Sequence, residues 1–428
     1  MSERRSVVIV DGVRTPFCRS WGVLEDVPAD DLARLAMAEA MARVDLDPAV
    51  VDEVVVGNIA QPAETTTLAR VAAIRAGIPR SVPAVTVNRN CGSGIDAIVS
   101  AYHRIESGLA DVVIAGGVES MSRIPFQLGQ RFTRRMMQLQ KARNGWSRLR
   151  RLSAFRAADL KPSAALAVGL TDAISGLNMG ETAELLARRF HISREQQDGF
   201  ALRSHQRAVA ARKRLRAEIV ACYPPPRIEP VTDDIGPRDD QTMDKLARLK
   251  PAFDRQYGTV TAGNSCMITD GAAALIVASE ARARELGLPY LGRIRAYGFA
   301  GCDPAQMGLG PVYATRVALG RAGIGLSAVQ LIEINEAFAA QVLAVLLAFA
   351  SRQFARDELA LDEPLGEIDP DIINVNGGAI ALGHPVGCSG TRLALTLLKE
   401  MARRELTFGL ATLCIGGGQG AALLLERA

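Results

Sequence analysis

Short apolar runs alternate with segments of helical periodicity along the first third of the chain. β-branched residues predict buried strands at residues 7–10, 54–56 and 112–115, the last of them ending in a glycine turn. Between the strands, apolar residues at helical spacing predict helices at residues 31–43 and 68–76. Strands that alternate with helices in this way indicate a layered α/β domain.

The last third of the chain repeats the pattern of the first. The apolar run at residues 51–58 has a counterpart at residues 329–336, and the glycine pair at residues 116–117 returns at residues 416–417. The spacing between matching segments grows along the chain, as a duplication with insertions would produce. We therefore expect two similar α/β halves that face each other across a pseudo-twofold axis, with a site at their junction.

A basic segment interrupts the repeat. Residues 123–161 carry eleven basic side chains and one acidic one, Asp159, so this segment nets +10 in a chain whose formal charge is +4. Its apolar residues recur at helical spacing: Phe132, Met136, Leu139, Trp146, Leu149, Leu152 and Phe155. The pattern predicts a basic amphipathic helix pair suited to an anionic membrane surface, a partner subunit or ligand phosphates. An ordinary surface helix with a solvated charged face is the alternative.

The length of 428 residues predicts two or three domains. We expect residues 1–122 to form the first segment of the N-terminal half and residues 123–257 to form an inserted, mainly helical domain. Residues 258–291 would return to the N-terminal half, and residues 292–428 would form the C-terminal half.

Composition narrows the class of protein. Hydrophobic residues make up 48% and charged residues 22% of the chain, which is typical of a globular protein. Seven cysteines without a Cys-x-x-Cys pair indicate a reducing compartment and give no zinc-finger spacing. The start of the chain leads into a strand without an apolar signal segment, and the apolar run at residues 337–350 is shorter than a membrane span. We expect a cytoplasmic protein, with any peripheral membrane contact made by the basic segment.

Cys91 lies where an apolar run at residues 82–87 gives way to a helical pattern at residues 95–106. Glycines after it, Gly92 and Gly94, allow a sharp turn and the close approach of a ligand. Free N–H groups at a helix start lower the pKa of a neighbouring thiol, which favours a nucleophilic thiolate. A buried structural cysteine is the alternative.

Among the four histidines, His384 differs from the rest. It lies in a glycine-rich loop before a predicted helix at residues 391–403, where it could act as a base for a cysteine. His103, His191 and His205 lie among charged residues of helical patterns, which favours solvated or capping roles.

Two more candidates lie in the C-terminal half. Cys414 ends an apolar run and precedes Gly416 and two further glycines, whose N–H groups could converge on an oxyanion. Asn335 follows the apolar run at residues 331–334, where it could cap the next helix or hold a water molecule.

Six segments, taken in order, resemble the thiolase family over essentially the whole chain. They are NCGSG (90–94), GGVESMS (116–122), GTVTAGNS (258–265), NEAF (335–338), GGAIALGHP (377–385) and CIGGG (414–418). The long basic insertion makes the chain most like the β-subunits of fatty-acid oxidation trifunctional complexes. The resemblance implies a duplicated five-layered α/β/α/β/α fold with an inserted loop domain.

The resemblance also implies the chemistry. Cys91 would attack the keto carbon of a 3-oxoacyl-CoA while His384 takes its proton, and the backbone amides of Cys91 and Gly416 would stabilise the oxyanion. His384 and a water held by Asn335 would stabilise the enolate of acetyl-CoA, and Cys414 would protonate it. Coenzyme A would then release the shortened acyl chain, as in fatty-acid β-oxidation.

The implied coenzyme A contacts are Met179, Gly263, Ser265, Met307 and Phe338. Two departures fall in this region. Asn178 precedes Met179 where many thiolases have histidine, and Cys266 follows Ser265 where an Ala-Ser pair is frequent.

Coenzyme A is a substrate here, and the resemblance implies no other cofactor. Zinc bound by Cys91, His384 and Cys414 is disfavoured, because neither a ligand spacing nor a fourth ligand is evident. The resemblance further implies a homodimer or larger assembly and a possible hydratase/dehydrogenase α-subunit as partner.

Several alternatives stay open at this point. A biosynthetic acetyl-CoA acetyltransferase would run the same chemistry in reverse, and a non-catalytic acyl-CoA or lipid-binding relative would be expected to lack the nucleophile or base. A decarboxylating 3-ketoacyl synthase uses two histidines, and Cys414 at the second position argues against it. Nucleic-acid binding is disfavoured, because the basic segment offers no clear aromatic platform.

Overall fold

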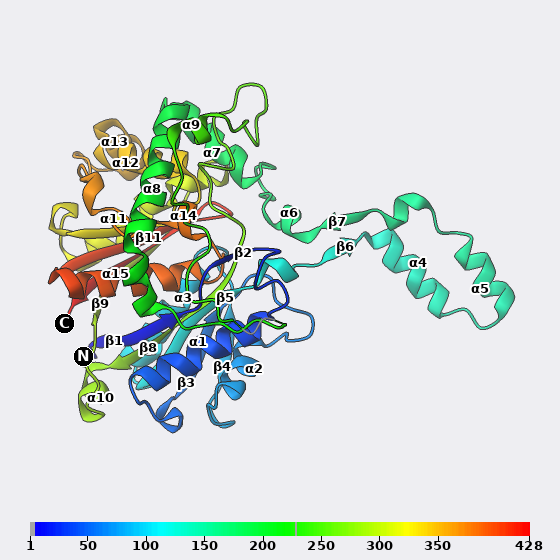
Figure 1. Ribbon diagram of the computed structural model, residues 1–428, viewed down its shortest axis with the longest axis horizontal. Helices are drawn as coiled ribbons and strands as arrows, with labels where there is room; N and C mark the ends of the chain where they lie inside the picture. Colours follow the sequence, from blue (N-terminus) through cyan, green and yellow to red (C-terminus); the bar gives the residue numbers. More distant parts are fainter. Residues whose placement is uncertain (1–4, 227–228) are drawn as a thin grey trace.

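The computed structural model describes residues 5–226 and 229–428, which form two similar halves joined through a mixed β-sheet (Figure 1). The strands run in the order β10-β11-β12-β9-β1-β8-β5-β3-β4. Their bounds are β1 Val7–Arg14, β3 Glu53–Gly57, β4 Ala84–Val87, β5 Val112–Glu119, β8 Thr269–Ser279, β9 Gly292–Gly301, β10 Leu331–Ile334, β11 Phe408–Ile415 and β12 Gln419–Arg427, with β2 (Cys18–Arg19) paired to β8.

The pseudo-twofold relation is visible in the strand pairing. In the N-terminal half β1 pairs antiparallel with β8, β8 antiparallel with β5, and β5 parallel with β3. In the C-terminal half β9, β12, β11 and β10 repeat the same relations in the same order. The halves join where β1 pairs with β9, through Val8–Arg293 and Ile9–Gly292.

Helices cover both faces of each half and complete the layers. They are α1 Ala29–Arg43, α2 Leu68–Arg75, α3 Ser93–Glu106, α10 Glu280–Glu285, α11 Gly310–Ala322, α12 Ala339–Ala350, α13 Arg352–Leu359, α14 Ala379–Leu382 and α15 Ser389–Arg404. Alternate side chains of the strands face different helices, because successive residues of a strand point to opposite faces. Val54 and Val56 pack with α1 and α2, whereas Val55 packs with α3 and α15. In the other half Leu410 packs with α11 and α12, and Ala411 faces α3 and α15.

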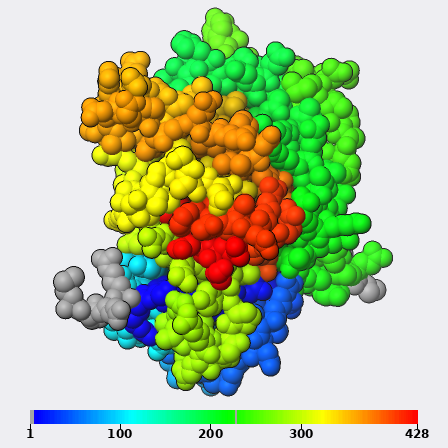
Figure 2. Space-filling view, turned by 90° about the vertical axis from the view of Figure 1, so that its left-hand side faces the viewer, coloured from blue at the N-terminus to red at the C-terminus, as the bar shows by residue number. Residues whose placement is uncertain are grey.

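This arrangement is the five-layered α/β/α/β/α fold. Helices α3 and α15, one from each half, form the middle layer between the two half-sheets. In Figure 2 the C-terminal half, yellow to red, lies against the N-terminal half, and the segment around α10 packs with the N-terminal half again after the insertion.

The insertion has two parts. A two-stranded ribbon carries a helical hairpin away from the body of the molecule (Figure 1), and two further helices, α7 and α8, lie against the C-terminal half. The elements are β6 Phe126–Leu128, α4 Gln130–Gln140, α5 Gly145–Leu152, β7 Pro162–Ala164, α6 Ala165–Gly169, α7 Met179–Arg189, α8 Arg194–Leu215 and α9 Met243–Ala247. We call residues 126–164 the arm.

One boundary differs from the sequence prediction. Strand β5 does not turn at its glycine pair but continues to Glu119, because β3 and β8 pair with it on both sides. Gly117 instead makes room for the loop that precedes α15, since a Cβ there would lie 2.2 Å from the carbonyl oxygen of Gly387. Among the described residues, no helix is both long and apolar enough to cross a membrane.

The first turns of α3 and α15 touch backbone to backbone. A Cβ on Gly94 would lie 2.5 Å from the amide nitrogen of Thr391, and a Cβ on Gly390 would lie 2.5 Å from that of Ile95. Glycine at both positions therefore permits the contact. Since Cys91 lies in the turn before α3 and His384 lies in the loop before α15, this crossing brings the two predicted site loops together.

Replacing Gly94 by alanine tests the crossing. The added methyl group meets backbone, which cannot swing aside, so we expect Gly94→Ala to lower the free energy of unfolding by about 1–3 kcal/mol. Gly320→Ala on the exposed face of α11, where nothing lies within 4 Å of the new Cβ, is the matched control. It should leave stability unchanged or raise it by up to about 1 kcal/mol. Urea unfolding curves compare the two, and equal stabilities would contradict the close crossing.

Candidate active site

Cys91 lies in the turn between β4 and α3, where it meets the C-terminal half. Asn90 adopts a positive φ of 45° and donates a hydrogen bond from Nδ2 to the carbonyl oxygen of Gly416, at 2.8 Å. The Cys91 thiol in turn receives hydrogen bonds from the backbone N–H groups of Gly416 and of Cys91 itself. These are the two amides that the sequence predicted for an oxyanion site.

Burial raises the pKa of the Cys91 thiol, and the two backbone N–H groups only partly offset that increase. The expectation that the start of α3 would leave a thiolate at rest is therefore wrong. Taking a thiolate out of water costs more free energy than two neutral donors return. The resting group near pH 7 is therefore a thiol.

His384, the predicted base, is held in a buried position. It lies between α14 and α15, and its ring is held at both nitrogens: Nδ1 lies 2.5 Å from Oγ of Ser389, and Nε2 lies 3.4 Å from Nδ2 of Asn335. Burial, assisted by the positive charge of Arg392, lowers the pKa of His384 to about 4. The imidazole is thus neutral near pH 7 and can accept a proton.

Asn335 follows β10 and does not cap a helix. The alternative role is wrong, because α12 begins at Ala339 behind the N-cap residue Phe338. The Oδ1 atom of Asn335 is buried and has no hydrogen-bond partner among the described residues. Because a buried amide oxygen without a partner is costly, this atom fits the water molecule expected beside His384.

Cys414 lies on β11 and is buried. Burial raises its pKa well above the ordinary value, and the neighbouring thiols of Cys91 and Cys266 raise it further. After it, Gly417 and Gly418 have φ of 92° and 75°, which turns the chain back into β12 and leaves the Gly416 N–H directed at Cys91. The site therefore draws Cys91 from one half and Cys414 and His384 from the other.

Cys266 adds a third thiol that the sequence analysis noted only as a departure. Its amide N–H donates to the carbonyl oxygen of Ala337 at 3.0 Å. Burial raises the pKa of Cys266 to about 12, and the neighbouring Cys91 thiol contributes to the increase. The signal in the sequence was the cysteine itself, next to the predicted contact Ser265.

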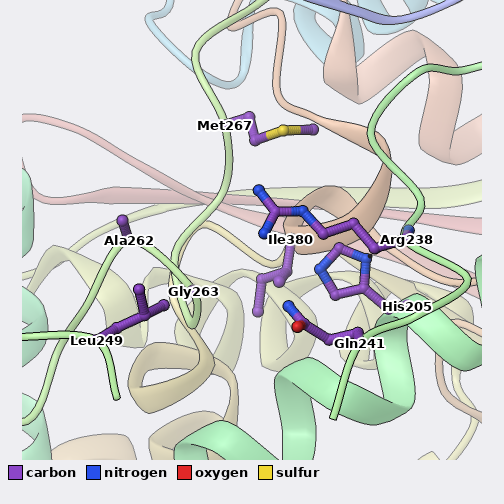
Figure 3. Close-up of a pocket in the computed structure, with 8 residues that line it drawn as sticks. All are labelled: His205, Arg238, Gln241, Leu249, Ala262, Gly263, Met267 and Ile380. Atoms are coloured by element: carbon purple, nitrogen blue, oxygen red, sulfur yellow. Dashed lines mark hydrogen bonds between the residues drawn. The ribbon is translucent and has the colours of Figure 1, made fainter. Parts of the chain in front are cut away.

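A pocket beside these groups opens between the insertion and the C-terminal half (Figure 3). It has a volume of about 110 Å³ and is lined by His205, Arg238, Gln241, Leu249, Ala262, Gly263, Met267 and Ile380. Gly263 is the one predicted coenzyme A contact among these lining residues. The wall combines apolar surface with a few polar groups, which suits a ligand of mixed character.

The other predicted contacts do not line this pocket. Met179 lies against Gly416, with Sδ 3.3 Å from the position of a Cβ there, and Ser265 forms a β-bridge to Phe338. The Phe338 ring meets Phe253 edge to face, with centroids 5.9 Å apart. Met307 is buried in the core of the C-terminal half and does not line the pocket.

The sequence prediction for His205 is wrong, and no role for Asn178 was predicted from the sequence. His205 is buried rather than solvated, and its Nδ1 accepts the N–H of Arg238 at 3.3 Å. Burial lowers the pKa of His205 to about 4, so the ring is neutral. Asn178 accepts N–H groups of Gly180 and Glu181 and so caps α7.

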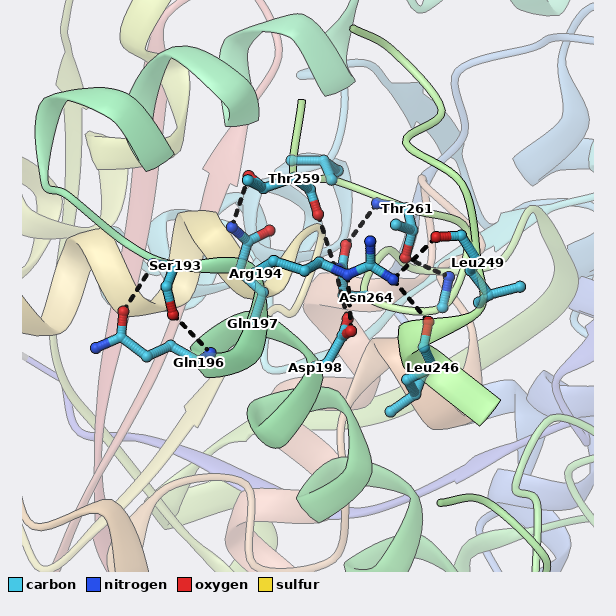
Figure 4. Close-up of polar contacts among 12 residues, drawn as sticks. Ser193, Arg194, Gln196, Gln197, Asp198, Leu246, Leu249, Thr259, Thr261 and Asn264 are labelled. Atoms are coloured by element: carbon cyan, nitrogen blue, oxygen red, sulfur yellow. Dashed lines mark hydrogen bonds and ion pairs between the residues drawn. The ribbon is translucent and has the colours of Figure 1, made fainter. Parts of the chain in front are cut away.

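A polar network fixes the loop that carries Gly263 (Figure 4). Asn264 accepts the N–H of Thr261 at 2.8 Å and donates to Asp198 of α8 at 2.9 Å. Asp198 also pairs with Arg194, which donates to the carbonyl oxygen of Leu246 at 2.6 Å. These bonds tie the loop that carries Gly263 to the inserted helix α8.

Comparisons with known proteins match this chain over nearly its whole length. The family model described as "Thiolase, N-terminal domain" matches residues 7–281, and "Thiolase, C-terminal domain" matches residues 288–427. A 3-ketoacyl-CoA thiolase of Yersinia pestis (strain Pestoides F) is 42% identical over 423 residues, covering 98% of this chain and 96% of that protein. Bacillus anthracis acetyl-CoA acetyltransferase superposes with a TM-score of 0.87 at 39% identity, over 100% of both chains. Human mitochondrial 3-ketoacyl-CoA thiolase in complex with CoA superposes with a TM-score of 0.85 at 38% sequence identity, over 99% of this chain and 98% of that one.

The protonation states make a testable prediction for Cys91. Because its pKa is raised and that of His384 is lowered, the resting pair is a neutral thiol and a neutral imidazole. Alkylation by iodoacetamide needs the thiolate, so its rate should rise about tenfold per pH unit between about pH 6 and pH 8. Quenched samples analysed by peptide mass give the rate at Cys91. A rate that stays constant over this range would instead indicate a thiolate–imidazolium pair.

Proposed function

This chain belongs to the thiolase family, and from that premise we propose how its own residues perform the reaction. The protein is an acyltransferase that cleaves a 3-oxoacyl-CoA with coenzyme A, giving acetyl-CoA and a shortened acyl-CoA. The proposal for its site rests on one observation above all: the Cys91 thiol receives the N–H of Gly416 from the opposite half.

Attack by Cys91 begins the reaction. Nε2 of His384 takes the thiol proton, and the sulfur adds to the keto carbon of the substrate. The negative charge that develops on the keto oxygen would be met by the N–H groups of Cys91 and Gly416, which lie beside the Cys91 thiol. A donor of this kind typically contributes about 10²- to 10³-fold in rate.

Carbon–carbon cleavage follows as the tetrahedral intermediate collapses. The acyl group stays on Cys91, and the electron pair leaves as the enolate of acetyl-CoA. His384, now protonated at Nε2, and a water on Asn335 stabilise the enolate oxygen, while the Cys414 thiol gives its proton to the enolate carbon. The resulting Cys414 thiolate takes the proton of incoming coenzyme A, whose sulfur then attacks the acyl carbon. The bond between this carbon and the Cys91 sulfur breaks, and the Cys91 thiolate regains its proton from Nε2 of His384.

Coenzyme A would occupy the pocket beside Gly263 (Figure 3). Arg238 and Gln241 supply polar groups to this pocket and Leu249 an apolar surface, which fits a pantetheine chain that alternates amides with methylenes. No further cofactor is required, because the ketone and thioester of the substrate stabilise the charges themselves.

Trapping the acyl-enzyme separates the roles of the two cysteines. Brief exposure to acetyl-CoA should leave an acetyl group on Cys91, seen by intact mass and peptide mapping. Cys414→Ala should still acquire this group but should lose about 10²- to 10⁴-fold in thiolysis, because only enolate protonation is removed. Cys91→Ser is the control for the site of labelling. An active enzyme whose Cys91 is never acylated would exclude the mechanism.

We further propose that a second copy of the chain pairs with β4. This strand ends the sheet, and its four residues are only partly buried although they are mostly apolar. An apolar edge strand with free N–H and C=O groups favours pairing with another strand. The Cys91 turn directly follows β4, so such a contact would also buttress the site.

The arm is proposed to rest on an anionic membrane surface. Its hairpin is closed by Phe132 and Phe155, whose ring centroids lie 5.7 Å apart. Trp146, Leu149 and Leu152 of α5 stay exposed, at 77%, 60% and 48%. Uncovered apolar side chains among many arginines are typical of helices that lie in the interface of anionic lipids.

Deleting residues 131–156 tests this proposal. The full chain should sediment with phosphatidylglycerol vesicles at low salt and much less with phosphatidylcholine, since the attraction is electrostatic. The deletion variant should lose this binding and keep its activity in solution. A Trp146→Ser/Leu149→Ser variant, which keeps every charge, should bind more weakly than the full chain. If the deletion variant sediments with the vesicles as much as the full chain does, the membrane proposal is overturned. The arm would then be a candidate binding site for a partner such as a hydratase/dehydrogenase subunit.

A further inference from the structure

We propose that Ser389 is a positioning residue that holds His384 in one tautomer, with the proton on Nδ1 and the lone pair of Nε2 presented to Cys91. This inference rests on the proposed role of His384 as the base. Ser389 does not touch substrate in this account; it acts only through the imidazole.

The hydrogen bonds around Ser389 fit this assignment. Its Oγ lies 3.1 Å from the carbonyl oxygen of Pro385, which can only accept, and 2.5 Å from Nδ1 of His384. The hydroxyl has a single proton, and giving it to Pro385 leaves the oxygen to accept from Nδ1–H. Ser389 and His384 are both buried, so no solvent competes for these positions.

The other half of the molecule shows the same arrangement with an unambiguous donor. Ser93 occupies the first position of α3 as Ser389 does in α15, and each is followed by a glycine of the helix crossing. The Ser93 hydroxyl donates to the carbonyl oxygen of Asn90 at 2.7 Å and accepts the backbone N–H of Arg89 at 2.9 Å. In the C-terminal half the imidazole Nδ1–H takes the place of that backbone donor.

The far side of the ring agrees with this assignment. The amide nitrogen of Asn335, a donor, faces Nε2 at 3.4 Å, which suits a bare nitrogen. The guanidinium of Arg392 on the next turn of α15 is fully buried and pairs with Glu333 at 2.6 Å. A fixed positive charge there opposes a second proton on the resting ring.

This hydrogen bond matters because His384 must accept the proton without changing its orientation. When Nε2 takes the proton of Cys91, Nδ1–H keeps its bond to Ser389, so the imidazolium forms in place. Nε2–H then becomes the donor to the enolate oxygen. In the opposite tautomer Nε2 already carries a proton, so it could not accept the thiol proton.

Nitrogen NMR of the resting enzyme tests the tautomer directly. The chain has only four histidines, so ring signals of ¹⁵N-histidine-labelled protein can be assigned, with His384→Asn identifying those of His384. We expect a protonated Nδ1 and a bare Nε2 in the unaltered protein. A protonated Nε2 at rest would overturn the proposal without any variant of Ser389.

Kinetics of Ser389→Ala test the consequence. We expect kcat for thiolysis to fall about 10- to 100-fold with KM nearly unchanged, as is typical when a group that orients a functional histidine is removed. Its His384 signals should show the other tautomer or a mixture. Thr396→Val is the matched control, because it removes another buried hydroxyl of α15, whose bond goes to Glu218 at 3.0 Å, away from His384.

The outcomes separate this inference from the proposed function. If the unaltered protein is active and His384→Asn is inactive, but Ser389→Ala matches Thr396→Val in kcat and keeps the tautomer, the role of Ser389 is refuted and the function stands. If the unaltered protein has no thiolysis activity, the proposed function itself fails.

Discussion

The molecule depends on the contact between the first turns of α3 and α15. Gly94 and Gly390 let two backbones meet where any side chain would hold them apart. Each helix begins directly after a loop with a functional group, Cys91 in one half and His384 in the other. The duplication thus does more than repeat a fold, because its middle layer places the two loops against each other.

Burial at this junction sets the chemistry. It keeps Cys91 a thiol and His384 a neutral imidazole, since both charged forms are poorly solvated there. In the proposed mechanism, the charges that appear during the reaction are met by groups already in place: the N–H of Gly416, the amide of Asn335 and the imidazole that Ser389 is proposed to hold. Preorganised donors in a dry site stabilise such charges without the reorganisation that water requires.

Local patterns in the sequence predicted the fold well and the environment of the site poorly. β-branched runs and repeated glycines identified both halves, because strands and turns depend on nearby residues. The resting state of Cys91, the burial of His205 and the continuation of β5 through its glycine pair depend on contacts with distant segments. The role of Ser389 could not be predicted from the sequence for the same reason, since its hydrogen bond with His384 forms only once the loop before α15 is folded.

The central claim is that the thiols of Cys91 and Cys414, from opposite halves, reach the same few carbon atoms. Treatment with 1,3-dibromoacetone, whose two reactive carbons flank one carbonyl, followed by peptide mapping measures this directly. The account predicts one bridge that joins the Cys91 and Cys414 peptides within a single chain and is absent from Cys91→Ser and Cys414→Ala. Separate modification of the two cysteines, with no bridge between them, would contradict it.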